Sequence, residues 1–220
     1  MKNYYHITTA QFGYPQPESK YEKITYSSAD GCPTCSIGLK QISEFRFRGA
    51  PKPLKKQITG LNWVFDQVFV REIVKAVFER EQVTGLTFST PLFHKNGLPI
   101  PEFYQLRVDT VIAPALLNTD LGTERCELPR DEKTVKFLMA NGSKLVEGPF
   151  CGQLKYNFPQ GQTLAFKKEA FGRQPDFIRT HEWFGSGGSA NRPILVSETV
   201  KELIEENKFK GAFFEKVELI

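Results

Sequence analysis

The sequence predicts an α+β fold of two related halves, each with mainly antiparallel strands, a cysteine-containing turn and one principal amphipathic helix. Three observations support this class: a helical pattern that occurs twice, alternating apolar and polar segments between its two copies, and two similar cysteine turns. A strand, a helix, a glycine and a second strand in each half, with further antiparallel strands between them, is the order of elements in an α+β protein.

The helical pattern occupies residues 70–88 and returns at residues 196–214. At a constant offset of 126 residues, the two segments are identical at seven of nineteen positions. A repeat used twice at this spacing indicates two similar half-domains, because a solenoid needs at least three short units. We therefore divide the chain into half-repeats at residues 1–96 and 97–220, which we expect to pack as one compact unit.

One face of each expected helix is apolar. In the first copy, apolar residues recur three and four positions apart, as in a buried helical stripe, at Val70, Ile73, Val74, Val77 and Phe78. The shorter stripe of the second copy consists of Val200, Leu203 and Ile204. Ser197 is the expected N-cap of the second helix. Gly85 and Gly211 are expected to end the two helices in the left-handed conformation.

Short segments in which apolar and polar residues alternate predict the strands. The predicted strands cover residues 23–28, 43–47, 86–93, 102–113, 134–139, 144–148, 163–166, 194–196 and 212–220. Residues 175–184 are apolar and are expected to be extended, whereas residues 120–133 are polar and are expected to form a loop.

The composition is that of a soluble globular protein, with 40% hydrophobic and 25% charged residues in a chain of 220. The net charge of +4 is small and the lysines are dispersed among acidic residues, which does not favour a nucleic-acid surface. The first residues lack the apolar run of a signal peptide, and no segment approaches the roughly eighteen apolar residues of a membrane span. We therefore expect a cytoplasmic protein that does not enter a membrane.

The chain contains four cysteines, which in a cytoplasmic protein are more typical of thiols or metal ligands than of disulfides. Cys32 and Cys35 lie in a tight turn with the sequence CPTC, and Cys151 lies in the similar turn GPFCG. Each half therefore opens with a knuckle of the form C-P-x-C-G. Ser36 replaces the glycine in the first knuckle, and Gly148 replaces the first cysteine in the second.

Two such knuckles can surround a zinc ion with four thiolates. Cys32, Cys35 and Cys151 remain from that scheme, and Cys126, 25 residues before Cys151, could supply the fourth ligand. The alternative is that metal binding has been lost and that Cys32 and Cys35 persist as buried thiols. A thioredoxin-type redox role is less favoured, because no helical pattern follows the CPTC sequence.

Short motifs in chain order give the sequence a family resemblance. They are the aromatic N-terminal strand, the GCPTC turn at residues 31–35, the PFCG turn at residues 149–152 and the closing segment VSETVKELIEENKFKGAFFEKVEL at residues 196–219. With them the chain resembles the double-CXXCG-motif family of bacterial proteins, which includes immunity proteins of myxobacterial swarming-inhibition toxin systems. The resemblance implies a cytoplasmic protein that binds and neutralises a cognate protein toxin without catalysis.

No set of residues in the sequence predicts an enzyme. His181 and Glu182 lack the second histidine of an H-E-x-x-H zinc site, and the other two histidines, His6 and His94, have no partner at a recognisable spacing. The glycine-rich segment at residues 185–189 lacks the lysine that follows the glycines of a phosphate-binding loop. An enzyme that works through Cys32 or His181 is the weakest hypothesis.

Trp183, Phe184 and Arg192 flank the glycine-rich segment and are the residues we expect to contact a protein partner, since aromatic residues and arginine are enriched at binding hot spots. The main alternative to an immunity protein is a zinc-ribbon-like protein that binds nucleic acid, which the CPTC turn and the mild basic charge suggest. The sequence does not define the oligomeric state or the identity of the toxin.

Overall fold

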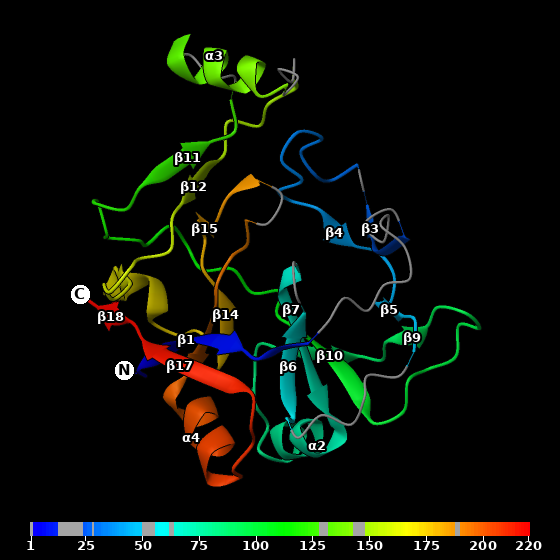
Figure 1. The fold of residues 1–220 in the computed structure, drawn as a ribbon. Coiled ribbons are helices and arrows are strands. Elements are labelled where there is room, and N and C mark those ends of the chain that lie inside the picture. The colour runs from blue at the N-terminus through cyan, green and yellow to red at the C-terminus, as the bar shows by residue number, and fades with distance from the viewer. Residues whose placement is uncertain are drawn as a thin grey trace.

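The computed structural model describes residues 2–12, 24–27, 29–49, 56–61, 64–127, 132–142, 148–187 and 190–220. In these residues the protein combines short helices with mainly antiparallel sheets, which confirms the predicted α+β class (Figure 1). The described helices include α2 (Glu72–Arg80), α3 (Glu132–Ala140) and α4 (Glu198–Glu206), with the 3₁₀ turn η1 (Lys168–Phe171). None of these helices is long and apolar enough to cross a membrane.

Two larger sheets form the body of the protein. The four-stranded sheet has the order β14 (Phe177–Arg179), β16 (Ile194–Ser197), β1 (Tyr4–Thr9) and β17 (Ala212–Lys216). The five-stranded sheet has the order β2 (Gln11–Phe12), β6 (Ile58–Leu61), β7 (Val64–Arg71), β10 (Phe103–Arg107) and β8 (Thr87–Ser89).

Four smaller sheets surround this body. One has the order β11 (Thr123–Arg125), β12 (Leu154–Tyr156) and β15 (Trp183–Phe184). The two-stranded sheets pair β13 (Ala165–Phe166) with β18 (Glu218–Leu219), β3 (Tyr26–Ser27) with β4 (Lys40–Gln41), and β5 (Arg46–Phe47) with β9 (Leu92–Phe93).

Each of the two large sheets contains the same strand–helix–strand unit with a third strand inserted. In one unit, β10 lies between β7 and β8 and is antiparallel to both, and α2 connects the outer strands. In the other, β1 lies between β16 and β17 in the same way, and α4 connects them. The two nine-residue helices begin 126 positions apart and lie next to each other in Figure 1.

The inserted strand of each unit comes from the other predicted half-repeat. Strand β10 belongs to residues 97–220 but completes the sheet of α2, whereas β1 belongs to residues 1–96 but completes the sheet of α4. Strand pairing therefore crosses the predicted boundary between residues 96 and 97. The two units match in strand order and direction. The shared origin of the halves and their division at this boundary stay predictions.

One continuous apolar core joins the two units and buries a face of each helix. Val74, Val77 and Phe78 of α2 pack in it together with Val200 and Ile204 of α4. Two details of the predicted stripes are wrong: the Ile73 side chain is 58% exposed, and Leu203 is only half-buried. Val70 is buried as expected, but it lies in strand β7, two residues before the helix begins.

The two helices end in the same hydrogen-bonded motif, three residues before the predicted glycines. The Val83 amide donates to the Phe78 carbonyl, and the Phe209 amide donates to the Ile204 carbonyl, as in a Schellman motif. Gly85 and Gly211 are left-handed as predicted, with φ of +84° and +106°. The left-handed residues that end the helices are instead Gln82, with φ of 52°, and Lys208, with φ of 55°.

Glycine at either helix end is expected to stabilise the protein. Gln82→Gly and Lys208→Gly should each raise the free energy of unfolding by about 1 kcal/mol, because glycine removes the steric cost of a left-handed residue. Both side chains are exposed, so little packing is lost. Urea denaturation measures the change. Gln82→Ala is the matched control and should give no gain, because alanine keeps the Cβ atom.

The carboxylate of Asp176 joins the two units just before strand β14. Its Oδ1 accepts hydrogen bonds from Lys2 Nζ at 2.7 Å and from the N-cap Ser197 Oγ at 2.9 Å. Its Oδ2 accepts from the amide and the hydroxyl of Thr84, which precedes strand β8. Burial alone would raise the pKa of Asp176, but these donors lower it from 3.8 to about 2.

Asp176→Asn is expected to cost about 2 kcal/mol of unfolding free energy at neutral pH. The folded-state pKa lies below the unfolded value, so the contribution of the carboxylate is complete above the unfolded value of 3.8 and is lost as the pH falls towards about 2. The difference between wild type and variant should therefore shrink over this window in pH-dependent denaturation. The exposed Asp109, changed to asparagine as a control, should show no such difference.

The predicted strand at residues 134–139 is wrong, because these residues lie within helix α3, and the predicted strand at residues 23–28 is partly wrong, because residues 24 and 25 are helical and only Tyr26–Ser27 form β3. Val135 and Leu138 are half-buried and three positions apart, and Lys136 pairs with Glu132 one turn earlier at 2.6 Å. The predicted loop at residues 120–133 contains strand β11. The predicted strand at residues 144–148 lies, except for Gly148, outside the described residues.

Candidate metal centre

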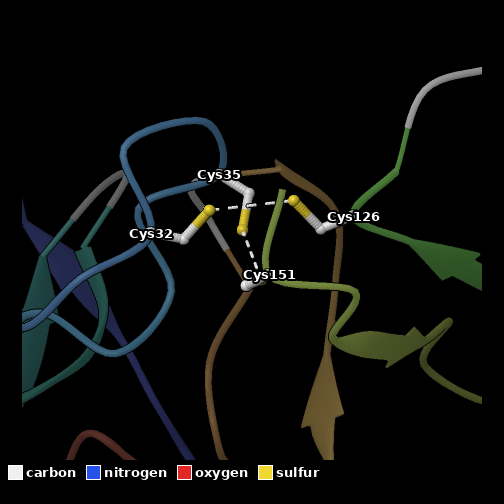
Figure 2. A group of neighbouring side chains, drawn as sticks. All are labelled: Cys32, Cys35, Cys126 and Cys151. Carbon is white, nitrogen blue, oxygen red and sulfur yellow. Dashed lines mark hydrogen bonds between the residues drawn. The ribbon is translucent and has the colours of Figure 1, made fainter. Parts of the chain in front are cut away.

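The four cysteines lie together at one end of the β11–β12 pair (Figure 2). Their Sγ atoms are all within 4.8 Å of one another. The Sγ of Cys32 is 3.8 Å from that of Cys126, and the Sγ of Cys35 is 3.7 Å from that of Cys151. Four sulfurs placed tetrahedrally at about 2.3 Å from a zinc ion are about 3.8 Å apart. The two measured separations match the edge of that tetrahedron.

The first pair of thiols is held by a turn that the backbone closes on itself. The Ser36 amide donates to the Cys32 carbonyl at 2.8 Å, and the Cys32 amide donates to the Ile37 carbonyl at 2.9 Å. Ser36 is left-handed with φ of 59°, and Gly152, which follows Cys151, is left-handed with φ of 66°. The residue after the second cysteine position therefore has the same conformation in both turns, although one of the two is not glycine.

The second pair of thiols is positioned by the pairing of β11 with β12. Cys126 follows β11, and its amide donates to the Gln153 carbonyl at 3.1 Å, while the Gly152 amide donates to the Cys126 carbonyl at 2.9 Å. These bonds extend the strand pair and set Cys126 beside Cys151. The side chain of Thr34 donates to the Pro149 carbonyl at 2.6 Å and links the two turns directly.

The thiols differ in exposure and in their hydrogen-bond donors. Cys35 and Cys126 are each 5% exposed, Cys32 is half-buried, and Cys151 is exposed. Burial would raise the pKa of the Cys32 thiol, but the backbone amides of Cys35 and Thr34 lower it to about 6. Burial raises the pKa of the Cys35 thiol to about 12. Amide donors to sulfur favour the thiolate, which is the form that binds metal ions.

The donor set fits a structural metal ion. Four cysteine sulfurs complete a tetrahedral shell and leave no open position for water or substrate, in contrast to catalytic zinc sites with three protein ligands. Soft thiolate ligands in this geometry select zinc or iron. Across the described ranges of the chain, no second group of three or more histidine, cysteine or acidic side chains is close enough together to hold a metal ion.

The three residues expected to contact a partner, Trp183, Phe184 and Arg192, are not all equally exposed. The Trp183 ring is half-buried and carries the Arg192 guanidinium 4.6 Å above its centre. Phe184 is 0% exposed in a core cluster, so its side chain offers no surface to a partner. Neighbouring residues of a strand face opposite sides, which separates Trp183 from Phe184. A role in partner binding stays a prediction for Trp183 and Arg192.

Comparison with known proteins adds no relative, since no protein-family model matches the chain and no curated protein matches it either. The resemblance to the double-CXXCG-motif family therefore stays a prediction that rests on the motifs at residues 31–35, 149–152 and 196–219. The clustered thiols are independent of that resemblance, because they follow from the fold of this chain.

Proposed function

We propose that the protein is a cytoplasmic bacterial immunity protein that binds a cognate toxin and neutralises it without catalysis. We further propose that Cys32, Cys35, Cys126 and Cys151 hold a structural zinc ion. The observation that carries the proposal is the four-thiol cluster, because a two-knuckle site is what the family resemblance implies. In this proposal Cys126 supplies the fourth ligand, because Gly148 stands where the second knuckle would have its first cysteine.

The proposed ion acts as a cross-link. When bound, zinc would tie the turn at residues 32–35 to the strand pair that carries Cys126 and Cys151, more than 90 residues later in the sequence. The chain's own residues orient the ligands through the backbone hydrogen bonds of Cys32 and through the hydrogen bond from Thr34 to the Pro149 carbonyl. Such a cross-link would make this part of the protein rigid, which suits a protein that binds a partner without catalysis.

Glu182 contributes to the fold through one of its carboxylate oxygens. Glu182 is buried, and its Oε1 accepts hydrogen bonds from the amides of Ala115 and Leu116 at 2.8 and 3.0 Å. The preceding residue, His181, is exposed. Oε1 thereby holds the backbone of residues 115–116 in place, whereas Oε2 is buried without a hydrogen-bond partner among the described residues.

Co-expression with the toxin encoded by the adjacent gene tests the proposal. The protein should restore growth and co-purify with the toxin as a stable complex, and a toxin from an unrelated system should give neither result. Failure of both rescue and co-purification would contradict the immunity function. Binding to DNA or RNA with a steep dependence on salt, in the absence of neutralisation, would instead support the nucleic-acid alternative.

A further inference from the structure

A cationic cleft lies beside the metal centre, between β4, β10 and the segment that joins β14 to β16. Its volume is about 460 Å³, within the range of sites that bind small groups. Four of its lining side chains are basic: Lys40, Arg107, Arg179 and Arg192. Trp183 adds an aromatic wall, and Asp109 is the one acidic residue among the described lining residues.

The charges of Arg107 and Arg192 in the cleft are little compensated by acidic neighbours. Arg179 donates from Nε to the Val108 carbonyl at 2.8 Å, and Arg192 donates from Nε to the His181 carbonyl at 3.1 Å. These acceptors are neutral carbonyl oxygens, and they orient the two guanidiniums. Within the described part of the chain, neither Arg107 nor Arg192 forms an ion pair, whereas Lys40 pairs with Asp30 at 3.1 Å.

The two guanidiniums on one wall repel each other. Burial lowers the pKa of Arg192, the nearby charge of Arg179 lowers it further, and Glu182 acts in the opposite direction. Like charges held together in a cleft create a positive potential that an anion relieves. This wall is therefore suited to an anionic group.

The floor of the cleft is neutral and fixed. Gln105 is 1% exposed and Gln67 is 5% exposed. The amides of Gln41 and Gln105 exchange hydrogen bonds, Gln105 also donates to Gln67, and Gln67 donates to the hydroxyl of Tyr26. Because these amides bond to one another, they hold the cleft open without adding negative charge, and the arginines set its selectivity.

We propose that this cleft binds the acidic side chains of a polypeptide, with Arg107, Arg179 and Arg192 receiving carboxylates and Trp183 packing against the flanking residue. Arginine forks match the geometry of carboxylates, and tryptophan and arginine are typical hot-spot residues. A nucleic-acid strand is less suited, because binding its backbone needs an extended basic groove, and here the cations are confined to one concave site. That the polypeptide is the toxin rests on the proposed function.

Titration of the full-length protein with a capped Asp-Leu-Glu tripeptide tests the cleft. Side-chain Nε–H resonances of Arg179 and Arg192 should shift and saturate in NMR spectra, and the capped Asn-Leu-Gln tripeptide should give no saturable shift. Arg107→Gln should weaken binding about tenfold or more, as expected for the loss of a charged hydrogen bond. No hydrogen bond or ion pair holds the Arg107 side chain in the described structure, so this variant should fold normally.

Arg80→Gln is the matched control, since Arg80 is exposed on α2 and pairs with Glu81 outside the cleft. Equal weakening by both variants, equal binding of the neutral peptide, or tighter binding of a DNA oligonucleotide at the same arginines would overturn the proposal. The titration uses no toxin. Failed rescue with intact peptide binding would contradict only the immunity function, and rescue without peptide binding would contradict only the cleft.

Discussion

Replacing Cys126 with serine is expected to abolish stoichiometric zinc binding and to lower the free energy of unfolding in zinc-containing buffer by about 4 kcal/mol. An ion that binds only the folded chain stabilises it by about this amount at a free concentration near a thousand times its dissociation constant. Serine preserves the size of the side chain but removes the thiolate ligand. Urea denaturation with and without added zinc measures the effect.

Chelation provides the control for this variant. Once a chelator has removed the metal, wild type and Cys126→Ser should unfold within about 1 kcal/mol of each other, since the remaining difference is that of a small buried side chain. A loss of stability that persists at full size in the chelator would assign Cys126 to packing alone. That result would contradict its role as a metal ligand.

Alanine at Gly85 or Gly211 is expected to destabilise the protein by about 3–5 kcal/mol, through steric overlap added to the cost of a left-handed residue. A Cβ atom on Gly85 would overlap with the Phe177 carbonyl oxygen of β14, and one on Gly211 would overlap with the Ile58 carbonyl oxygen of β6. Each glycine thus follows the helix of one large sheet and abuts a strand of the other sheet, the edge strand β14 for Gly85 and the inner strand β6 for Gly211. Thermal or urea denaturation of the two variants measures the cost.

Gly97→Ala is the matched control for both. Gly97 is also left-handed, with φ of +69°, but no atom lies within 4 Å of an added Cβ. The control should therefore lose only the backbone contribution, about 1 kcal/mol. If Gly85→Ala and Gly211→Ala cost no more than Gly97→Ala, that result would contradict the close contacts of Gly85 with Phe177 and of Gly211 with Ile58.

The parts of the fold that depend on local pattern could be predicted from the sequence. The apolar spacing that predicted α2 and α4 reflects their buried faces, and the Ser197 side chain accepts from the Val200 amide as an N-cap should. Helix α3 was missed because Val135, Phe137 and Met139 alternate as in a strand. Phe137 is 68% exposed and Met139 63% exposed, so neither contributes to a buried face in the described structure.

The candidate site could be predicted only in part for a related reason. Cys32, Cys35 and Cys151 lie in turns with a recognisable local sequence, whereas Cys126 lies in the segment ERCELP, which has no turn signal. Its position is set by the register between β11 and β12, in which Arg125 pairs with Leu154. Register depends on which strands meet in the folded chain, so no local pattern around Cys126 could reveal it.

The cationic cleft was not predicted for the same reason. Arg179 in β14 and Arg192 before β16 come from neighbouring strands of the four-stranded sheet, whereas Arg107 comes from β10 of the five-stranded sheet and joins them only through the arrangement of the two large sheets. The sequence pointed to Arg192 and Trp183 only because their residue types are common at binding hot spots and they flank a glycine-rich segment. What the fold adds is their concave arrangement with Arg107 and Arg179.

Native mass spectrometry of the purified protein tests the central claim, that the four clustered thiols form one metal site, most directly. The expected result is one zinc ion per chain, lost together with the stabilising effect of zinc when any one of Cys32, Cys35, Cys126 and Cys151 is changed to serine. A metal-free chain after expression in zinc-supplemented medium, or a chain in which these cysteines form disulfides, would contradict it.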